Sequence, residues 1–275
     1  MTSPALQDIV ALLGRPAAGN PAQYLFERAG ERAGLDARFI SADVAPERLA
    51  DALAGAAALA FRGCLLAGPL RAAALPLVAA ASPAATFAGA ASLLTLHEAG
   101  FTAHMTDGRG VVEAIRAHRD PAGKPALVVG AEAAGRAAAL ELSLAGATGV
   151  AVCDRDGARA AALAAALEAV DVANVTVIDA EPAIAVPPDV AVVVVALPPA
   201  ELPAFAGLRA DLVIAECGLA AQPSPLGALV AATGACLVDA LEVHAARFAI
   251  DFQALTGASA DPDLLRDALD EFLSA

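Results

Sequence analysis

The sequence predicts an α/β protein of two domains, in which the second half forms a doubly wound parallel sheet. Two observations carry this prediction. Short runs that are apolar on both faces alternate with segments suited to helices, as in sheets covered by helices on both sides. One such run leads into a glycine-containing loop at 130–135 that opens an alanine-rich helical segment. The 275 residues are enough for two modest domains with their own cores.

In the second half, the expected strands are the apolar runs at 125–129, 149–154, 175–179, 190–197, 211–216 and 235–239. Runs of this kind are typical of parallel strands buried on both faces. We expect helical segments between them, so that the runs form one doubly wound sheet.

The first half repeats the alternation more loosely. Strands are expected at 9–13, 37–44 and 63–67, and helices at 21–33 and 46–59. Runs at 92–96 and 101–105 flank Glu98-Ala99-Gly100, which predicts a hairpin. Asp261-Pro262-Asp263 has the order of a helix cap followed by proline, which predicts a last helix that runs to Leu273.

Charge and composition exclude several classes of partner. The formal net charge of −14 argues against binding to nucleic acid or to an anionic membrane surface. The uncharged stretch 72–96 is rich in alanine and broken by prolines and a glycine, so we expect buried helix, turn and strand there and no membrane span. Because the amino terminus lacks the features of a signal peptide, the expected location is cytoplasmic. The expected partner is a small molecule, and a homodimer is left open.

The cysteines and histidines do not predict a metal site. The four cysteines lie far apart in the sequence, and the four histidines are scattered. Neither set shows the close paired spacing of metal ligands. We therefore expect no metal, and thiols that are reduced and mostly buried.

The loop at 130–135 resembles a dinucleotide-binding loop with one change. Gly130 and Gly135 stand where such loops have glycine, but Glu132 replaces the middle glycine. As a residue of the first turn of the helix that follows, Glu132 would carry its negative charge at the positive end of the helix dipole, which is favourable. Against a phosphate at about 5 Å and an effective dielectric of about 20, however, its repulsion is about 3 kcal/mol. The loop thus predicts a dinucleotide domain in which Glu132 opposes the cofactor.

Taken in order, the motifs of the chain resemble the shikimate dehydrogenase family over nearly its whole length. The motifs are Leu-Gly-Arg-Pro at 13–16, Phe-Arg-Gly at 61–63, Ala-Ala-Leu-Pro-Leu at 73–77, Gly-Ala at 89–90, Thr-Asp-Gly-Arg-Gly at 106–110, Gly130 with Gly-Arg-Ala at 135–137, Val-Asp at 238–239, and Phe252 with Thr-Gly at 256–257. The resemblance implies a substrate-binding domain at 1–107 with 240–275, to which the last helices return. It also implies a Rossmann-like NAD(P)-binding domain at 108–239.

The family resemblance implies hydride transfer between NADP or NAD and a cyclohexene polyol or its ketone, with a lysine and an aspartate at the reacting hydroxyl. In this chain Arg71 aligns with the lysine and Asp107 with the aspartate. An arginine keeps its proton at ordinary pH, so Arg71 can hold an anion but cannot cycle a proton. Asp107 has an alternative interpretation as a helix-capping carboxylate. His104 is the alternative proton carrier, although strand alternation places it on the face opposite Asp107.

The substrate positions implied by the resemblance are largely less polar here. Asn20, Ser92, Thr106 and Arg247 are the polar residues that align with them. Met105 and Ile214 replace the asparagine and tyrosine of the family. Each unmade hydrogen bond to a polyol costs about 1 kcal/mol, so we do not expect shikimate itself to be an efficient substrate.

The cofactor positions implied by the resemblance are Gly130, Gly135, Arg136, Asp154 and Arg155. An aspartate at the end of the second strand suits the free ribose hydroxyls of NAD and repels the 2′-phosphate of NADP, while Arg155 leaves NADP open. The sequence therefore predicts an NAD(P)-dependent oxidoreductase acting on an alicyclic hydroxy or keto compound. The alternative is a silent family member that keeps the fold as a ligand-binding or assembly module.

Overall fold

The structure, a computed structural model, describes residues 7–172, 174–219 and 224–274. The chain forms two compact units, the first of 1–106 with 247–275 and the second of 107–246. The division at 246 and 247 falls within the long helix α9 (Ala240–Thr256).

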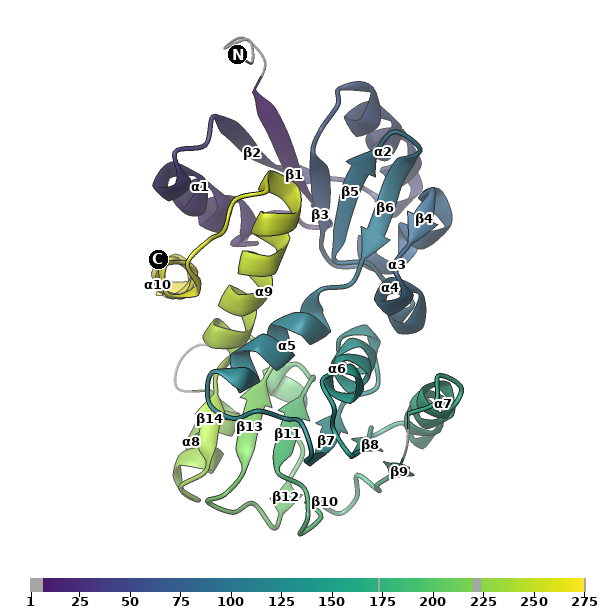
Figure 1. Cartoon of the computed structure of the whole chain (residues 1–275), viewed down its shortest axis with the longest axis vertical. Helices are drawn as coiled ribbons and strands as arrows, with labels where there is room; N and C mark the ends of the chain where they lie inside the picture. The colour runs from purple at the N-terminus through teal and green to yellow at the C-terminus, as the bar shows by residue number, and fades with distance from the viewer. Residues whose placement is uncertain (1–6, 173, 220–223, 275) are drawn as a thin grey trace. The chain divides into compact units, whose positions relative to one another are not determined.

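The first unit contains a mixed sheet of six strands, in the order β2-β1-β3-β5-β6-β4 (Figure 1). Its strands are β1 (Asp8–Gly14), β2 (Ala37–Asp43), β3 (Gly63–Leu66), β4 (Ala80–Ala81), β5 (Leu93–His97) and β6 (Gly100–His104). β1 is parallel to β2 and β3, whereas β5 is antiparallel to both β3 and β6. The predicted hairpin is therefore present, and Gly100 closes its turn with a φ of 115°.

Helices cover the first sheet, and the carboxyl-terminal helix α10 (Pro262–Ser274) belongs to this unit. The other helices are α1 (Ala22–Ala33), α2 (Leu49–Ala58), α3 (Leu70–Ala73) and α4 (Pro83–Ala88). Short 3-10 turns at Pro46–Arg48 and Leu75–Leu77 precede α2 and follow α3. Phe26 of α1 packs edge-on against Phe39, Phe248 and Phe252, with ring centroids 5.3 to 6.1 Å apart. This aromatic cluster joins α1, β2 and the end of α9.

The second unit contains a fully parallel sheet in the order β14-β13-β11-β7-β8-β9 (Figure 1). Its strands are β7 (Pro125–Val129), β8 (Gly149–Cys153), β9 (Val175–Val177), β11 (Val192–Val195), β13 (Val213–Glu216) and β14 (Cys236–Val238). All six expected runs are thus strands of one doubly wound sheet. The order reverses between β7 and β11, which is where open α/β sheets bind ligands at the carboxyl ends of the strands.

The expectation of a helix between every pair of strands in this half is wrong in two connections. α6 (Ala133–Leu144), α7 (Gly157–Glu168) and α8 (Pro225–Ala231) follow β7, β8 and β13, and α5 (Asp107–Arg116) precedes β7. Between β9, β11 and β13, the chain instead forms β10 (Ile184–Ala185), β12 (Phe205–Ala206) and a 3-10 turn at Pro199–Glu201. Prolines at 182, 187, 188, 198, 199 and 203 interrupt these segments. A proline inside a helix removes a backbone donor and clashes with the preceding turn, so these connections cannot be regular helices.

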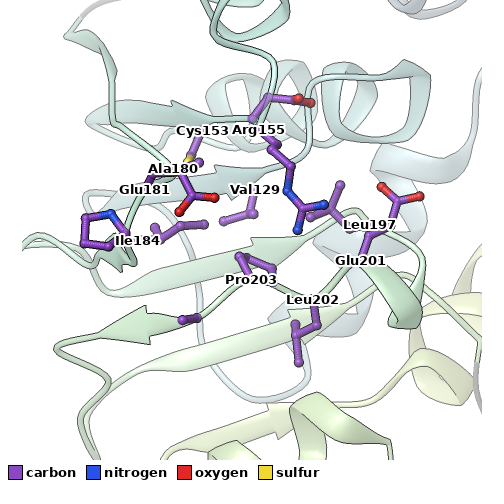
Figure 2. Close-up of a pocket in the computed structure, with 13 residues that line it drawn as sticks. Val129, Cys153, Arg155, Ala180, Glu181, Ile184, Leu197, Glu201, Leu202 and Pro203 are labelled. Carbon is purple, nitrogen blue, oxygen red and sulfur yellow. The ribbon is translucent and has the colours of Figure 1, made fainter.

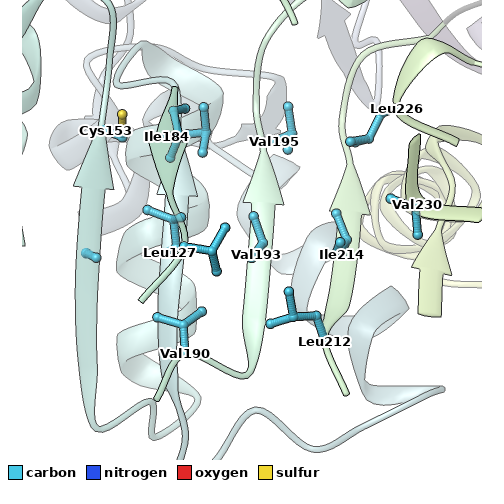
Figure 3. Close-up of a cluster of buried hydrophobic side chains, with 13 residues drawn as sticks. Leu127, Cys153, Ile184, Val190, Val193, Val195, Leu212, Ile214, Leu226 and Val230 are labelled. Atoms are coloured by element: carbon cyan, nitrogen blue, oxygen red, sulfur yellow. The ribbon is translucent and has the colours of Figure 1, made fainter. Parts of the chain in front are cut away.

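Apolar side chains of the parallel strands fill the core of the second unit. Figure 3 shows Leu127, Val193 and Ile214 on adjacent strands, with Leu226 and Val230 of α8 nearby. Ile214, which aligns with the family tyrosine, is fully buried in this cluster. α5 and α6 pack so closely that a Cβ added at Gly108 would lie 2.2 Å from the carbonyl oxygen of Ala137.

Two further sequence expectations concern membranes and thiols. Among the described residues, no helix has the length and apolar character needed to cross a bilayer. Cys64 and Cys153 are buried, whereas Cys217 and Cys236 are half-buried. Burial raises the pKa of the Cys64 thiol to about 12.

Candidate functional site

The loop after β7 requires glycine at two positions. Gly130 has a φ of 101°, and a Cβ there would lie 2.7 Å from the carbonyl oxygen of Ala196. A Cβ at Gly135 would lie 1.8 Å from the carbonyl oxygen of Gly130. The first turn of α6 therefore lies directly against the end of β7. This is the close backbone approach that the glycines of a dinucleotide loop permit.

Glu132 is the N-cap residue of α6 and not, as expected from the sequence, a residue of its first turn. Its side chain accepts no hydrogen bond from the helix N–H groups. Instead, its Oε1 lies 2.5 Å from Nη1 of Arg159, in the first turn of α7. The acid is thus held by a cation from the next helix and does not cap the amino end of α6.

Arg159 joins two more carboxylates. Its Nη2 lies 3.1 Å from Oδ1 of Asp154, and its Nε lies 3.6 Å from Oδ2 of Asp156. Three carboxylates therefore surround one guanidinium, and this cluster of Glu132, Asp154, Asp156 and Arg159 keeps two net negative charges. Below, we call it the loop charge cluster.

Asp154 is the buried member of the loop charge cluster, with a side chain only 2% exposed. Its Oδ2 accepts a hydrogen bond from the backbone N–H of Ala131 at 2.8 Å, and its Oδ1 accepts one from that of Asp156 at 2.8 Å. The carboxylate thereby ties the glycine loop to the end of β8. Besides the role toward a ribose that is expected from the sequence, Asp154 therefore holds the glycine loop in place.

A pocket of about 140 Å³ opens at the carboxyl ends of β7, β8 and β11. Figure 2 shows Arg155 extending from the end of β8 over this pocket, with Glu181 and Glu201 among its other lining side chains. Val129, Ile184 and Leu197 supply apolar walls. An apolar pocket with a few charged groups at this edge of the sheet suits an adenosine moiety.

Arg136, the remaining expected cofactor residue, lies one residue after Gly135 in α6 and is half-buried. Burial lowers the pKa of its guanidinium from the ordinary arginine value. It belongs to the first turn of α6, directly after the glycine loop.

In the first unit, three of the four expected substrate residues lie in one polar network. The Oγ of Ser92 and the Oγ1 of Thr106 are 2.8 Å apart, and Ser92 also accepts the backbone N–H of Thr106. Thr106 donates to Oδ1 of Asp251 at 2.6 Å. Asp251 Oδ2 lies 3.8 Å from Nη1 of Arg247, whose guanidinium carbon stands 4.0 Å above the ring centroid of Phe248. We call Ser92, Thr106, Asp251 and Arg247 the buried polar network.

Asn20, the fourth expected substrate residue, supports the start of α1. Its Oδ1 accepts the backbone N–H of Ala22 at 3.0 Å, so its side chain has a structural role. No hydrogen bond in the described structure links it to the buried polar network.

Arg71 belongs to the short helix α3, and its Nη2 lies 3.3 Å from Sδ of Met105, the residue before Thr106. The structure thus places this arginine next to the segment that carries the buried polar network. His104 lies on β6 with Nε2 2.9 Å from Oγ1 of Thr95. Burial and the neighbouring His97 lower the pKa of His104, which favours the neutral imidazole.

Asp107 is the first residue of α5 in the second unit. Its charge contributes to raising the pKa of Cys217, whose thiol reaches about 12 mainly through burial. Next to Cys217, Glu216 is buried and accepts a hydrogen bond from Oγ of Ser224 at 2.6 Å. Burial raises the pKa of Glu216, and Asp239 adds to the effect. A carboxylate at the end of β13 is therefore biased toward its protonated form.

Sequence reasoning missed Arg159 and Asp251. Arg159 follows Asp156 at helical spacing, and Asp251 follows Arg247 at helical spacing within an apolar stretch. An acid inside an apolar helical face was the signal that could have identified Asp251. Within the described ranges, no group of three or more His, Cys, Asp or Glu side chains is arranged to hold a metal ion.

Comparison with known proteins supports one family. No family model matches the chain. It is 36% identical over 157 residues to the NADP⁺ shikimate dehydrogenase of Citrifermentans bemidjiense, covering 56% of this chain and 54% of the other. The chain thus spans about half the length of the relatives that it matches in sequence.

Solved structures match over nearly the full chain. The ligand-free 5-ketofructose reductase of Gluconobacter sp. strain CHM43 has a TM-score of 0.92 and 26% identity, covering 97% of this chain and 99% of the other. Shikimate 5-dehydrogenase of Thermus thermophilus, in complex with NADP(H) and shikimate, has a TM-score of 0.81 and 27% identity, covering 97% and 100%. Solved structures of this fold include complexes with NADP⁺ and with NAD. Together with the mixed first sheet, the parallel second sheet and the glycine loop, these matches show that the chain belongs to the shikimate dehydrogenase family.

Proposed function

We propose that this protein is an NAD(P)-dependent oxidoreductase, in which the second unit holds the dinucleotide and the first unit binds an alicyclic hydroxy or keto compound. One observation carries the proposal. Glu132, the residue that opposes a phosphate in the loop, is paired with Arg159 and leaves the amino end of α6 uncapped by its own side chain. Helix N–H groups in that position are a ready anion site.

The residues of the second unit fit a dinucleotide. Gly130 and Gly135 allow the backbone approach that a pyrophosphate needs, and Arg136 adds a positive charge in the first turn of α6. The pocket of Figure 2 would take the adenosine end, with Arg155 over it. When bound, a nicotinamide would supply the hydride acceptor or donor. The retained loop geometry favours cofactor binding over the silent alternative.

The substrate proposal concerns the first unit and Asp107. Arg71 would hold a carboxylate or an oxyanion, because a guanidinium presents paired donors to such groups. Arg247, Ser92 and Thr106 would orient hydroxyl groups, and Asn20 would contribute from the start of α1. Asp107 would assist at the reacting hydroxyl. Arg71, Arg247, Ser92 and Asn20 differ from the residues that the family pattern has at these positions, so we do not propose shikimate as the efficient substrate.

Similarity to a 5-ketofructose reductase supports a substrate other than shikimate. That protein, by its name, reduces a keto sugar, and its structure matches this chain with a TM-score of 0.92. A substrate panel should therefore include ketoses as well as shikimate and quinate.

The test begins with calorimetric titration of the unmodified protein with NAD and with NADP. Dissociation constants below about 1 mM for at least one of them are expected, and no binding of either at millimolar concentration would contradict the proposal. Turnover is then followed by the absorbance of reduced nicotinamide across shikimate, quinate and ketoses. Carboxylate substrates should lose at least about tenfold in kcat/KM in Arg71→Met. Arg62→Met is the matched control, since Arg62 pairs with Asp8 at an exposed position.

A further inference from the structure

A thiol, an imidazole and a carboxylate stand in a row in the second unit, and none of them lines the pocket of Figure 2. Sγ of Cys236 lies 3.5 Å from Nδ1 of His118, and Nε2 of the same ring lies 2.7 Å from Oε1 of Glu242. The imidazole stands between the thiol and the acid, so the three groups do not converge on one point as metal ligands do. We call Cys236, His118 and Glu242 the thiol triad.

Three segments that are far apart in the sequence position the thiol triad. Cys236 is the first residue of β14, which lies at one edge of the parallel sheet (Figure 1). His118 follows α5, and its backbone N–H donates to the carbonyl of Ile115 at 3.0 Å. Glu242 lies in the first turn of α9, where its backbone N–H donates to Oδ1 of Asp239 at 2.9 Å. Each side chain of the triad therefore starts from a backbone position that is fixed by secondary structure or a turn.

Cys236 differs from the other thiols in its surroundings. It is half-buried, and the side chains of His118 and Glu242 beside it are 34% and 24% exposed. Burial raises the pKa of Cys64 to about 12, that of Cys153 to about 11 and that of Cys217 to about 12. Thiols of that kind are inert in water near neutral pH, whereas a partly exposed thiol beside an imidazole is placed to react.

The order of the three groups is that of a nucleophile, its base and an acid that orients the base. When the Nε2 proton of His118 is donated to Glu242, Nδ1 has a lone pair toward Cys236 and can take the thiol proton. The product is a thiolate beside an imidazolium, and the carboxylate of Glu242 stabilises the imidazolium.

We propose that Cys236 is a modification site that exchanges with small disulfides, with His118 as its base and Glu242 as the residue that orients the imidazole. The Cys236 thiolate attacks one sulfur of the disulfide, whose S–S bond breaks as the new S–S bond forms. The departing thiolate takes the proton from His118, so the products are a mixed disulfide on Cys236 and one small thiol. The inference does not depend on dinucleotide binding and so stands apart from the proposed function.

Other charged and titratable side chains on the surrounding segments have partners of their own. The pairs are Arg116 with Glu113, Arg209 with Asp211, Arg119 with the backbone carbonyl of Asp211, Asp239 with the backbone N–H of Glu242, and His244 with the backbone carbonyl of Cys217. Helix α8, which packs against β14, carries no charged residue. Glu242 is therefore the charged side chain that acts on the ring of His118 by direct contact.

The test follows the reaction of the folded protein with dithiodipyridine, a small disulfide whose released thiol is read by absorbance. Mass spectrometry of peptides should identify Cys236 as the first thiol to react, and Cys236→Ser should remove this fast phase. At about pH 6, His118→Gln should slow the phase at least about fivefold, because little thiolate forms without the base. At about pH 10 the difference should fall below about twofold, since a thiol ionises there without help.

Two further variants separate the base from the residue that orients it. Glu242→Gln should slow the fast phase at about pH 6 by less than His118→Gln does, because it removes the stabilising charge and leaves the base. His97→Gln is the matched control, since His97 contacts Thr95 in the first unit and should leave the rate unchanged.

Several outcomes would overturn the inference. One is labelling of another cysteine before Cys236, and another is an unchanged rate in His118→Gln. Slowing of His118→Gln by the same factor at both pH values would mean that His118 only supports the structure, which also overturns it. Should His118→Gln not fold, the unmodified protein decides. Its rate should rise less than about threefold per pH unit between about pH 6 and 8, and a tenfold rise per unit, as for a thiol without a base, would contradict the inference.

Discussion

The two units each contain an arginine paired with acids, but in opposite environments. In the second unit, Arg159 is 45% exposed and Glu132 is 71% exposed. In the first unit, Arg247 is 14% exposed and Asp251 is fully buried. Exposed ion pairs contribute little to stability because solvent screens them, so the value of the pair of Arg159 and Glu132 lies in where it holds charge. A buried pair carries a large desolvation cost, and breaking it leaves a charge without compensation.

The difference in burial separates positioning from stability. We expect changes at Glu132, an exposed member of the loop charge cluster, to alter ligand affinity with small effects on unfolding. We expect changes in the buried polar network to alter the free energy of unfolding directly. Backbone contacts belong to neither network. Substitutions that disturb them are expected to have the largest effect on the free energy of unfolding, because neither solvent screening nor side-chain rearrangement relieves a clash with the backbone.

The largest effect is expected for Gly135→Ala. The new Cβ would lie 1.8 Å from the carbonyl oxygen of Gly130, so α6 or the loop must move. We expect a loss of about 3 kcal/mol or more in the free energy of unfolding, together with loss of dinucleotide binding. Denaturant unfolding and calorimetric titration measure the two effects. A loss below about 1 kcal/mol would show that the loop is not tightly packed.

Gly157→Ala is the control for that experiment. Gly157 is the first residue of α7, and a Cβ there meets no atom within 4 Å. Alanine is the better helix former, so this change should raise the free energy of unfolding by up to about 1 kcal/mol. The pair of variants distinguishes the close approach at Gly135 from a general effect of replacing glycine.

The next effect is expected for Asp251→Ala, which tests the buried side of the comparison. Removing this carboxylate takes the acceptor from Thr106 and the anion from Arg247. We expect a loss of about 3 kcal/mol in the free energy of unfolding. Asp251→Asn should cost less, because its amide oxygen can still accept from Thr106. Denaturant unfolding gives these differences.

Glu132→Ala is the matched change on the exposed side. It removes the carboxylate nearest to Arg159 and should change the free energy of unfolding by less than about 1 kcal/mol. Equal losses in Asp251→Ala and Glu132→Ala would mean that burial does not distinguish the two networks, and the comparison would fail.

Much of the fold could be predicted from the sequence because its signals are local. The expected runs all correspond to strands of the parallel sheet, and Glu98-Ala99-Gly100 forms the turn of the expected hairpin. Apolar strand runs do not predict what connects them, so the expectation of helices is wrong at two connections. Prolines 187, 188, 198 and 199 were visible in the sequence and exclude regular helices there.

The candidate site could be predicted only in part. Alignment with a family pattern identified Ser92, Thr106 and Arg247, which lie in one network. It could not identify Asp251, which bonds to Thr106 across 145 positions, or Arg159, which pairs with Glu132 across 27. Such pairs depend on how strands and helices pack. The sequence shows that Glu132 would repel a phosphate, but only the structure shows that Glu132 is paired with Arg159.

The smallest effect is expected for Glu216→Gln. This variant tests whether a buried acid in the second unit behaves like Asp251 in the first. Burial raises the pKa of Glu216 above the ordinary glutamate value, and Ser224 donates to its carboxyl group. Well below about pH 4, the acid is protonated in both the folded and unfolded states, so it contributes no pH dependence. As the pH rises through the ordinary value, the unfolded state releases its proton first, and the free energy of unfolding falls until the folded acid also ionises.

The glutamine variant cannot ionise and still accepts from Ser224. It should therefore have the higher Tm at about pH 8, and this advantage should shrink as the pH is lowered toward about 5. Thermal unfolding of both proteins across this range measures the difference, with Glu47→Gln at an exposed position as control. A constant Tm difference at all pH values would show that hydrogen bonding to Ser224, and not ionisation, governs Glu216, which would place it with Asp251 as a structural acid.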